Sequence, residues 1–337
     1  MKKLFAFLLA MTMLFAFAAC TAPAVEVPAV DKTSGQEEDS LSISSLARLI
    51  MVTGGDSGTY YAFGGVIANV LSSTVDNLEI TAVTSGASAA NCRSLNNGEA
   101  DLAIMQNDVL DYAVTGTETM AEDGAMSKLR AIASLYPEAV QLVALKSANI
   151  HSIADLKGKR VCVGDQGSGS ETNAKQVLEA YGLSYDDFDV QYLSFSEAST
   201  AMQNGTVDAA FATSALPNSA IQELSKMKEI VVIPIDGEGA DKLLEKHPFY
   251  AKTVIPAATY GVNEAETVAM LATLVCSEDL DEAVVYQITK HLFEEQPAMA
   301  AGHARGGDLD INKALDGVTV DFHDGALRYY REQGVID

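Results

Sequence analysis

The sequence is poor in basic residues. Its 337 residues include 22 lysines and arginines against 46 aspartates and glutamates, which gives a formal net charge of −24 at pH 7. This shortage argues against nucleic-acid binding, because phosphate contacts depend on clustered Lys and Arg. The acidity favours solubility and does not by itself identify a ligand.

Cysteine and histidine are also scarce. The four cysteines show no CxxC spacing, and the five histidines are scattered without an HExxH motif. We therefore expect no metal site and no cofactor. Cys92, Cys162 and Cys276 each lie in an apolar run, which predicts buried, inert thiols.

Long apolar runs are absent after residue 20. The run from Leu4 to Ala19 follows Lys2 and Lys3 and ends in small residues, which is typical of a secretory signal peptide at 1–19. FAAC (17–20) has the form of a lipobox, so we expect a lipid on Cys20, with an ordinary signal peptide as the alternative. Residues 20–42 are rich in Pro, Ala, Ser and acids and show no helix or strand period, which predicts a flexible tether. The protein is therefore expected outside the cytoplasm, anchored to the membrane.

The body of the chain contains an internal duplication. NGEADLAI (97–104) resembles NGTVDAAF (204–211), VTGGDSG (52–58) resembles VCVGDQGSG (161–169), and 85–98 resembles 194–205. The matches keep their order and nearly constant separation, which predicts two similar lobes. Each lobe alternates β-rich runs with helix patterns, so we expect an α/β fold with mostly parallel strands and helices on both faces.

Two segments are expected to cross between the lobes, one at 132–145 and one near 254–262. The helix pattern at 280–293 would then return to the first lobe. These crossings predict a hinged clamshell. Lobe I would comprise 43–138 and 256–337, and lobe II would comprise 139–255.

The candidate binding residues lie in loops at the carboxyl ends of strands, where such sheets bind their ligands. These loops are rich in Gly, Ser and Thr, whose backbone N–H groups and hydroxyls suit an anionic group such as a carboxylate. For any single loop, an ordinary glycine turn with a Ser or Thr helix cap is the alternative. Repetition at equivalent places in two lobes favours binding. The candidates are Gly55, Ser57, Thr59, Ser85, Ser88, Gln106, Gly167, Ser168, Gly169, Ser170 and Thr213.

Catalytic motifs are incomplete. GDQGSGSE (164–171) has the glycines of a P-loop, but Ser170 occupies the position of its lysine. GGDSG (54–58) lacks the GxSxG order of a nucleophile elbow. Asp56 and Asp165 occupy equivalent turns, where aspartate more often caps the turn than acts as an acid or base. We therefore expect a binding protein and not an enzyme.

The combined order of several blocks resembles the TAXI family of TRAP-transporter solute receptors. The similar segments are 54–72, 84–108, 129–144, 153–171 and the run up to Ala220. The resemblance implies a type II periplasmic-binding-protein fold, a TRAP-type membrane permease as partner, and a small carboxylate ligand such as glutamate or a related amino or organic acid. A lipoprotein of an ABC importer and, less favoured, an enzyme on the same two-lobed scaffold are the alternatives. The ligand contacts that the resemblance implies are Tyr60, Ser88, Asn91, Gln106, Tyr136, Ser168, Gly169 and Ser170.

Overall fold

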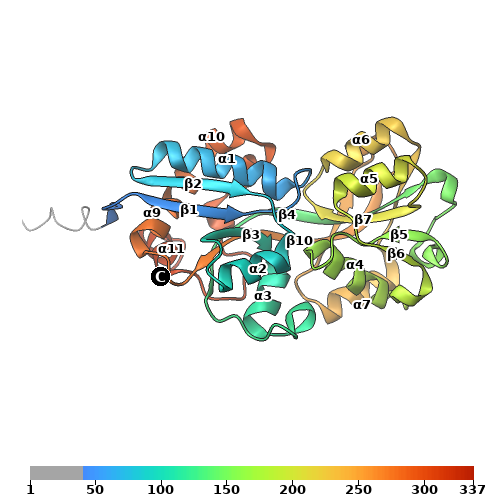
Figure 1. Cartoon of the computed structure of the whole chain (residues 1–337), viewed down its shortest axis with the longest axis horizontal. Helices are drawn as coiled ribbons and strands as arrows, with labels where there is room; N and C mark the ends of the chain where they lie inside the picture. The colour runs from blue at the N-terminus through green and yellow to red at the C-terminus, as the bar shows by residue number, and fades with distance from the viewer. Residues whose placement is uncertain (1–40) are drawn as a thin grey trace, which may run out of the picture.

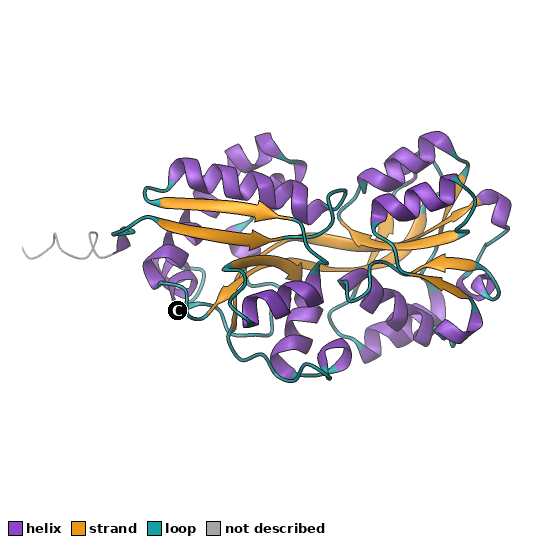
Figure 2. Cartoon of the chain, in the orientation of Figure 1, coloured by secondary structure: helices purple, strands orange, loops and turns teal. Residues whose placement is uncertain are grey.

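A computed structural model describes residues 41–337 as two lobes that share one ten-stranded sheet. Figure 1 and Figure 2 show the lobes side by side, each with strands between helices. The predicted signal peptide and Cys20 lie outside the described residues, as does the predicted tether up to residue 40. The strand order along the sheet is β2-β1-β3-β10-β4-β7-β5-β6, with β8 paired to β4 and β9 paired to β10.

The first lobe opens with alternating strands and helices, and β1 pairs in parallel with both β2 and β3. Tyr60, Phe63, Ile67 and Leu71 recur at three- and four-residue spacing, which predicts one apolar helix face, and the structure buries all four. The elements are β1 (Ala47–Val52), α1 (Thr59–Thr74), β2 (Leu78–Val83), α2 (Ser88–Asn96), β3 (Leu102–Gln106) and α3 (Asn107–Thr115).

The second lobe repeats this arrangement, since β5 pairs in parallel with both β6 and β7. The orders β2-β1-β3 and β6-β5-β7 are equivalent, so the predicted duplication is present in the fold. The elements are β5 (Arg160–Cys162), α4 (Gly169–Ala180), β6 (Asp189–Gln191), α5 (Phe195–Gln203), β7 (Ala209–Ser214), α6 (Ser219–Met227), β8 (Ile230–Ile233), α7 (Gly237–Lys246), β9 (Ala251–Ile255) and α8 (Ala257–Tyr260).

Two long antiparallel strands, β4 (Leu129–Leu145) and β10 (Ala265–Ser277), run through both lobes. β4 was predicted as a crossing. The second crossing is β10, which pairs with β9 in lobe II and with β3 in lobe I. The segment 254–262, which we expected to cross, instead ends β9 and forms α8. Each crossing strand belongs to both lobes, so the structure sets no single boundary residue between them. The lobe limits given above therefore remain predictions.

The chain after β10 covers the first lobe, as the helix pattern at 280–293 predicted. Ile288 and Leu292 of α9 pack in one core with Phe63 and Ile67 of α1. Within residues 41–337, no helix combines the length and the apolar character needed to span a bilayer. The C-terminal helices are α9 (Glu282–Glu294), α10 (Gln296–Gly302) and α11 (Asp324–Glu332).

The three cysteines of the described chain are free and buried, which confirms the prediction of buried thiols. Burial raises the pKa of the Cys92 thiol to about 12 and shifts the pKa values of Cys162 and Cys276 in the same direction. Since the thiolate is the reactive form, these residues are chemically inert at neutral pH.

Candidate ligand-binding cleft

A small cavity of about 40 Å³ lies between the lobes, at the carboxyl ends of β1 and β5. A single water requires roughly 10–15 Å³ of such space, so the cavity has room for only a few water molecules. It is lined by Gly54, Gly55, Ser57, Gly58, Thr59, Tyr60, Ala87, Ser88, Gln106, Glu138, Asp165, Ser168, Gly169, Ser170, Phe195, Thr213 and Ser214.

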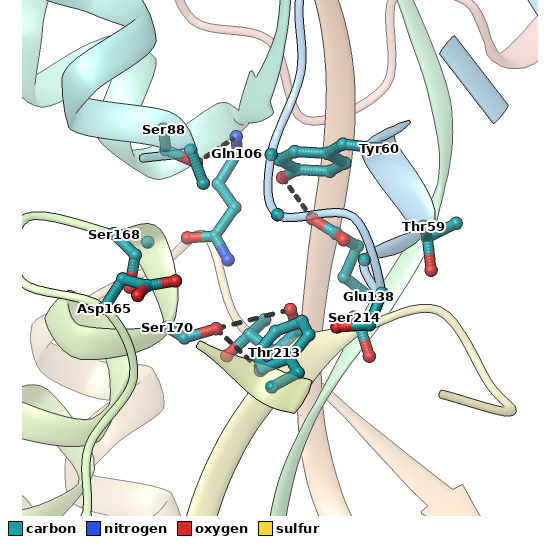
Figure 3. Close-up of a pocket in the computed structure, with 17 residues that line it drawn as sticks. Thr59, Tyr60, Ser88, Gln106, Glu138, Asp165, Ser168, Ser170, Thr213 and Ser214 are labelled. Atoms are coloured by element: carbon teal, nitrogen blue, oxygen red, sulfur yellow. Dashed lines mark hydrogen bonds between the residues drawn. The ribbon is translucent and has the colours of Figure 1, made fainter. Parts of the chain in front are cut away.

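The side chains around the cavity come from both lobes and from a crossing strand. Figure 3 shows Gln106 and Tyr60 of lobe I on one side, and Ser170 and Thr213 of lobe II on the other. Glu138, on β4, lies beside Tyr60. Both lobes and the strand that joins them therefore contribute side chains to one cavity wall.

Three helices of lobe I begin at the cavity without a side-chain cap. The N-cap residues of α1, α2 and α3 are Gly58, Ala87 and Gln106, and none makes a side-chain hydrogen bond to its helix. The first backbone N–H groups of a helix lack partners within the helix and carry the positive end of its dipole. The first turns of α1 and α2 therefore offer donors to an anionic ligand group, whereas in α3 the Asp108 carboxyl already accepts the Val109 N–H. Helix α4 differs, because the Ser168 hydroxyl accepts a hydrogen bond from the Glu171 N–H at 3.1 Å.

Three polar side-chain atoms of the cavity wall are buried without a hydrogen-bond partner. They are Ser57 Oγ, Gln106 Oε1 and Thr213 Oγ1. Gln106 and Thr213 are only 2% and 5% exposed. Buried polar atoms in a folded protein are normally satisfied, so a cluster of such atoms around one cavity indicates a missing partner there.

The only charged side chains in this wall are acidic. Glu138 is 1% exposed, and its Oε2 accepts a hydrogen bond of 2.5 Å from the Tyr60 hydroxyl. Burial raises the pKa of Glu138 to about 8, and burial also raises the pKa of Asp165. None of the described residues that line the cavity is a lysine, arginine or histidine. An anionic group would therefore have to bind to backbone N–H groups and hydroxyls.

Direct contacts join the lobes around the cavity. The Ser219 hydroxyl donates to the backbone carbonyl of Ser57 across the cleft at 2.9 Å. Gly169 approaches Gln106 so closely that a Cβ at position 169 would lie 2.1 Å from Gln106 Oε1. These contacts and the small free volume describe a closed clamshell.

Ten of the fourteen residues predicted to bind ligand lie in the cavity wall. They are Gly55, Ser57, Thr59, Tyr60, Ser88, Gln106, Ser168, Gly169, Ser170 and Thr213. Their contact with a ligand remains a prediction.

The other four predicted residues lie outside the wall. Asn91 is fully buried and donates to the carbonyls of Thr53 and Ile104. The Ser85 hydroxyl donates to the Asn91 side chain. Gly167 forms a turn with φ of +76°. These three residues lie beside the residues that form the cavity wall, and ligand contact by them remains a prediction.

Tyr136 is the fourth residue outside the wall. It is buried in the core of lobe I, where its ring packs edge-on against Phe63 with 5.7 Å between ring centroids. Tyr136 therefore occupies the position of a core aromatic. Tyr136 and Glu138 are two residues apart on β4, and of the two only Glu138 lines the cavity. Ligand contact by Tyr136 remains a prediction.

Sequence reasoning missed Glu138 and Phe195 as wall residues. Glu138 carried a usable signal, since it is the one charged residue in the apolar stretch SLYPEAVQLVAL (134–145). A charged side chain in a strand that is buried on both faces is costly unless it has a partner, so it indicates either an ion pair or a functional site. Phe195 carried none, because it follows a serine cap in the manner of any first-turn helix residue.

Comparison with known proteins gives a family and a fold. A family model described as NMT1-like matches residues 51–334. Among solved structures, the alkanesulfonate-binding protein of Xanthomonas axonopodis pv. citri, bound to MOPS, is 18% identical with a TM-score of 0.50 and covers 80% of this chain and 82% of its own. The binding component of an ABC phosphonate transporter from Pseudomonas aeruginosa is 13% identical with a TM-score of 0.53. The match covers 77% of this chain and 79% of that protein. A putative L-cystine ABC transporter from Listeria monocytogenes is 14% identical with a TM-score of 0.50. The match covers 79% of this chain and 98% of that protein.

These neighbours confirm the predicted two-lobed type II periplasmic-binding-protein fold. The matched family and the neighbours contradict the predicted assignment to the TAXI family. The TRAP-type permease was inferred from that assignment alone, so it is corrected together with it.

Proposed function

We propose, because this chain belongs to the NMT1-like family, that it is the extracytoplasmic solute-binding protein of an ABC-type importer. It binds a small amino or organic acid between its lobes and delivers it to the membrane permease. Solved structures that share its fold include binding proteins named as parts of ABC transporters. This was the alternative that the sequence left open.

The observation that carries the proposal is the composition of the cavity wall. Loops at equivalent places in the two lobes supply Ser57 from one side and Ser168 and Ser170 from the other. Unpartnered hydroxyl and amide atoms and uncapped helix starts face a space that only lobe closure forms. Such a site holds a small polar solute and releases it when the lobes separate.

The same cavity wall favours a small acid as the ligand. Helix N-termini and hydroxyls bind carboxylates without a basic side chain, and this accounts for acid binding by a protein of net charge −24. The closed cavity leaves little free space, which favours a small solute. Binding without turnover is the proposed activity.

Thermal unfolding of the chain from residue 43 tests this function. The protein is first denatured and refolded to remove any solute carried over from expression, and then screened against amino acids, dicarboxylates, keto acids, sulfonates and sugars. A solute present at a hundred times its dissociation constant stabilises the folded state by about 2.7 kcal/mol. Stabilisation by an acid of one class supports the proposal, and a blank screen after refolding contradicts it.

A further inference from the structure

Glu138 is a buried carboxyl group with half of its hydrogen-bonding capacity unused. Its Oε2 accepts the Tyr60 hydroxyl, and its Oε1 accepts no hydrogen bond from the described residues. None of the ion pairs within residues 41–337 includes it. A buried carboxyl group with one hydrogen bond and no cation is costly to ionise, so it has capacity for a further partner.

A purely structural role accounts poorly for this residue. Gln141, on the same strand, shows how the fold satisfies a buried polar side chain: its oxygen accepts the Tyr260 hydroxyl and its amide donates to Ser214. Glu138 has one such bond, and it lies in the wall of the cavity. Its free oxygen atom is therefore available to a ligand.

The remainder of the wall suits the opposite charge. The uncapped first turns of α1 and α2 and the unpartnered hydroxyls of Ser57 and Thr213 suit an acid group. A ligand that satisfies both parts of the wall carries an acid at one end and a nitrogen that donates hydrogen bonds at the other.

We infer that Glu138 determines specificity by accepting the ammonium group of the ligand, so that the solute is an amino acid or another amine-bearing acid and not a plain carboxylate, sulfonate or phosphonate. This inference rests on the proposed function and narrows it. Tyr60 is the positioning residue, since its hydroxyl holds the Glu138 carboxylate on the cavity side.

Protonation of Glu138 gives the inference a second readout. The groups that act on this carboxyl are Tyr60 from α1, Tyr136 from its own strand and Asp108 from α3, and Asp165 lies in the same wall. None is cationic, and burial keeps Glu138 protonated in the empty site up to a pH of about 8. An ammonium ligand binds the ionised form, so its affinity should rise as pH increases from 6 to 8. The affinity of a plain acid should not rise.

The test uses pairs of compounds that differ only in the amino group: L-alanine and propionate, L-glutamate and glutarate, and taurine and ethanesulfonate. Titration calorimetry of the refolded chain measures each affinity for the unchanged protein, for Glu138→Gln, and for Glu266→Gln as a control. Glutamine retains the shape and the acceptor for Tyr60 but removes the charge. Glu266 is an exposed residue of β10 outside the cavity.

We expect the amine-bearing member of at least one pair to bind more tightly. Glu138→Gln should lose about 10- to 100-fold in affinity for it, as expected for a hydrogen bond to a charged group, while Glu266→Gln loses nothing. Equal or tighter binding of the plain acid, or unchanged affinity in a folded Glu138→Gln, overturns the inference while the proposed function stands. If no compound in the pairs or in the wider screen binds, the proposed function itself is contradicted.

Discussion

The side-chain amide of Asn173, in lobe II, donates a hydrogen bond of 3.1 Å to the carboxyl group of Asp108, in lobe I. Both residues are fully buried. The contact belongs to a network in which Tyr250 connects Asn173 to Gln176, and Gln176 donates to the Tyr112 hydroxyl of lobe I. Helices α3 and α4 thus meet through polar groups next to the cavity, and opening the lobes would break these bonds.

Removal of the Asn173 amide should shift the protein toward its open form. Asn173→Ala leaves the Asp108 carboxyl without its partner from the other lobe, so closure loses about 1.5–3 kcal/mol if Asp108 is ionised and less if it is protonated. We expect weaker solute binding and a larger radius of gyration by small-angle scattering with solute present. Asn312→Ala, at an exposed position, is the control. Equal affinity and equal scattering for the two variants would show that the network does not favour closure.

A methyl group at position 169 should hinder closure directly. In Gly169→Ala the new Cβ would lie 2.1 Å from Gln106 Oε1, a distance that real contacts do not reach. Because the clash exists only when the lobes meet, and because the buried Gln106 side chain must move to relieve it, we expect affinity to fall by up to about tenfold, the equivalent of 1.4 kcal/mol. The unfolding midpoint without solute should change little. Gly65→Ala, where nothing lies within 4 Å of the added carbon, should bind normally. Tight binding by Gly169→Ala would mean that the lobes close differently.

The contribution of Glu138 and Asp108 to the stability of the solute-free protein should fall between pH 5 and pH 8. Burial raises the pKa of Glu138 to about 8 and that of Asp108 to about 7, whereas both ionise near pH 4 in the unfolded chain. The folded state therefore binds more protons in this range, and its advantage is lost as pH rises, at up to about 1.4 kcal/mol per pH unit for each group. Urea unfolding at several pH values measures this slope. Glu138→Gln and Asp108→Asn should each flatten it, and an unchanged slope in both would refute the assignment.

Glycine at position 164 should be required for stability. Gly164 has φ of +102°, and an added Cβ would lie 2.9 Å from the Ser170 side chain. We expect Gly164→Ala to lower the free energy of unfolding by about 1–3 kcal/mol. Gly182→Ala shares the positive φ, +75°, but has open space around the new carbon, so it should cost less. Urea denaturation compares the two variants, and equal losses would rule out a role for the contact with Ser170.

The proposed lipid anchor at Cys20 is tested in cells. Cys20→Ala should move the protein from the membrane fraction to the soluble fraction and abolish labelling by a radioactive fatty acid. Covalent lipid is the physical basis of the expected difference, because acyl chains contribute roughly 0.8 kcal/mol for each buried CH₂. If the protein with Cys20 intact is already soluble and unlabelled, so that Cys20→Ala alters neither measurement, an ordinary signal peptide is favoured.

Much of the fold could be read from local patterns. The apolar spacing from Tyr60 to Leu71 predicted α1, and the paired NG and Gly-Asp landmarks predicted two lobes of equivalent strand order. Hydrophobic periodicity reports which face of an element is buried, so it is visible in one dimension. The position of the second crossing could not be predicted in this way, because contacts between residues distant in sequence select the strand that pairs with both lobes. Here β10 takes that place, and the predicted segment forms the end of β9 and α8.

The candidate site divides in the same way. Nine of the ten predicted wall residues were identified as candidates in the glycine-, serine- and threonine-rich segments at strand ends, because such segments meet at one edge of the sheet in this fold. The tenth, Tyr60, was implied by the family resemblance. Whether a buried polar residue faces ligand or core depends on its partners. Asn91 meets backbone carbonyls and Tyr136 meets Phe63, whereas Glu138 keeps one oxygen for the cavity. The sequence by itself determined the two lobes, their core-facing stripes and the loops between them. Only the tertiary structure decided which side chains line the cavity, because hydrogen-bond partners come from distant segments that folding brings together.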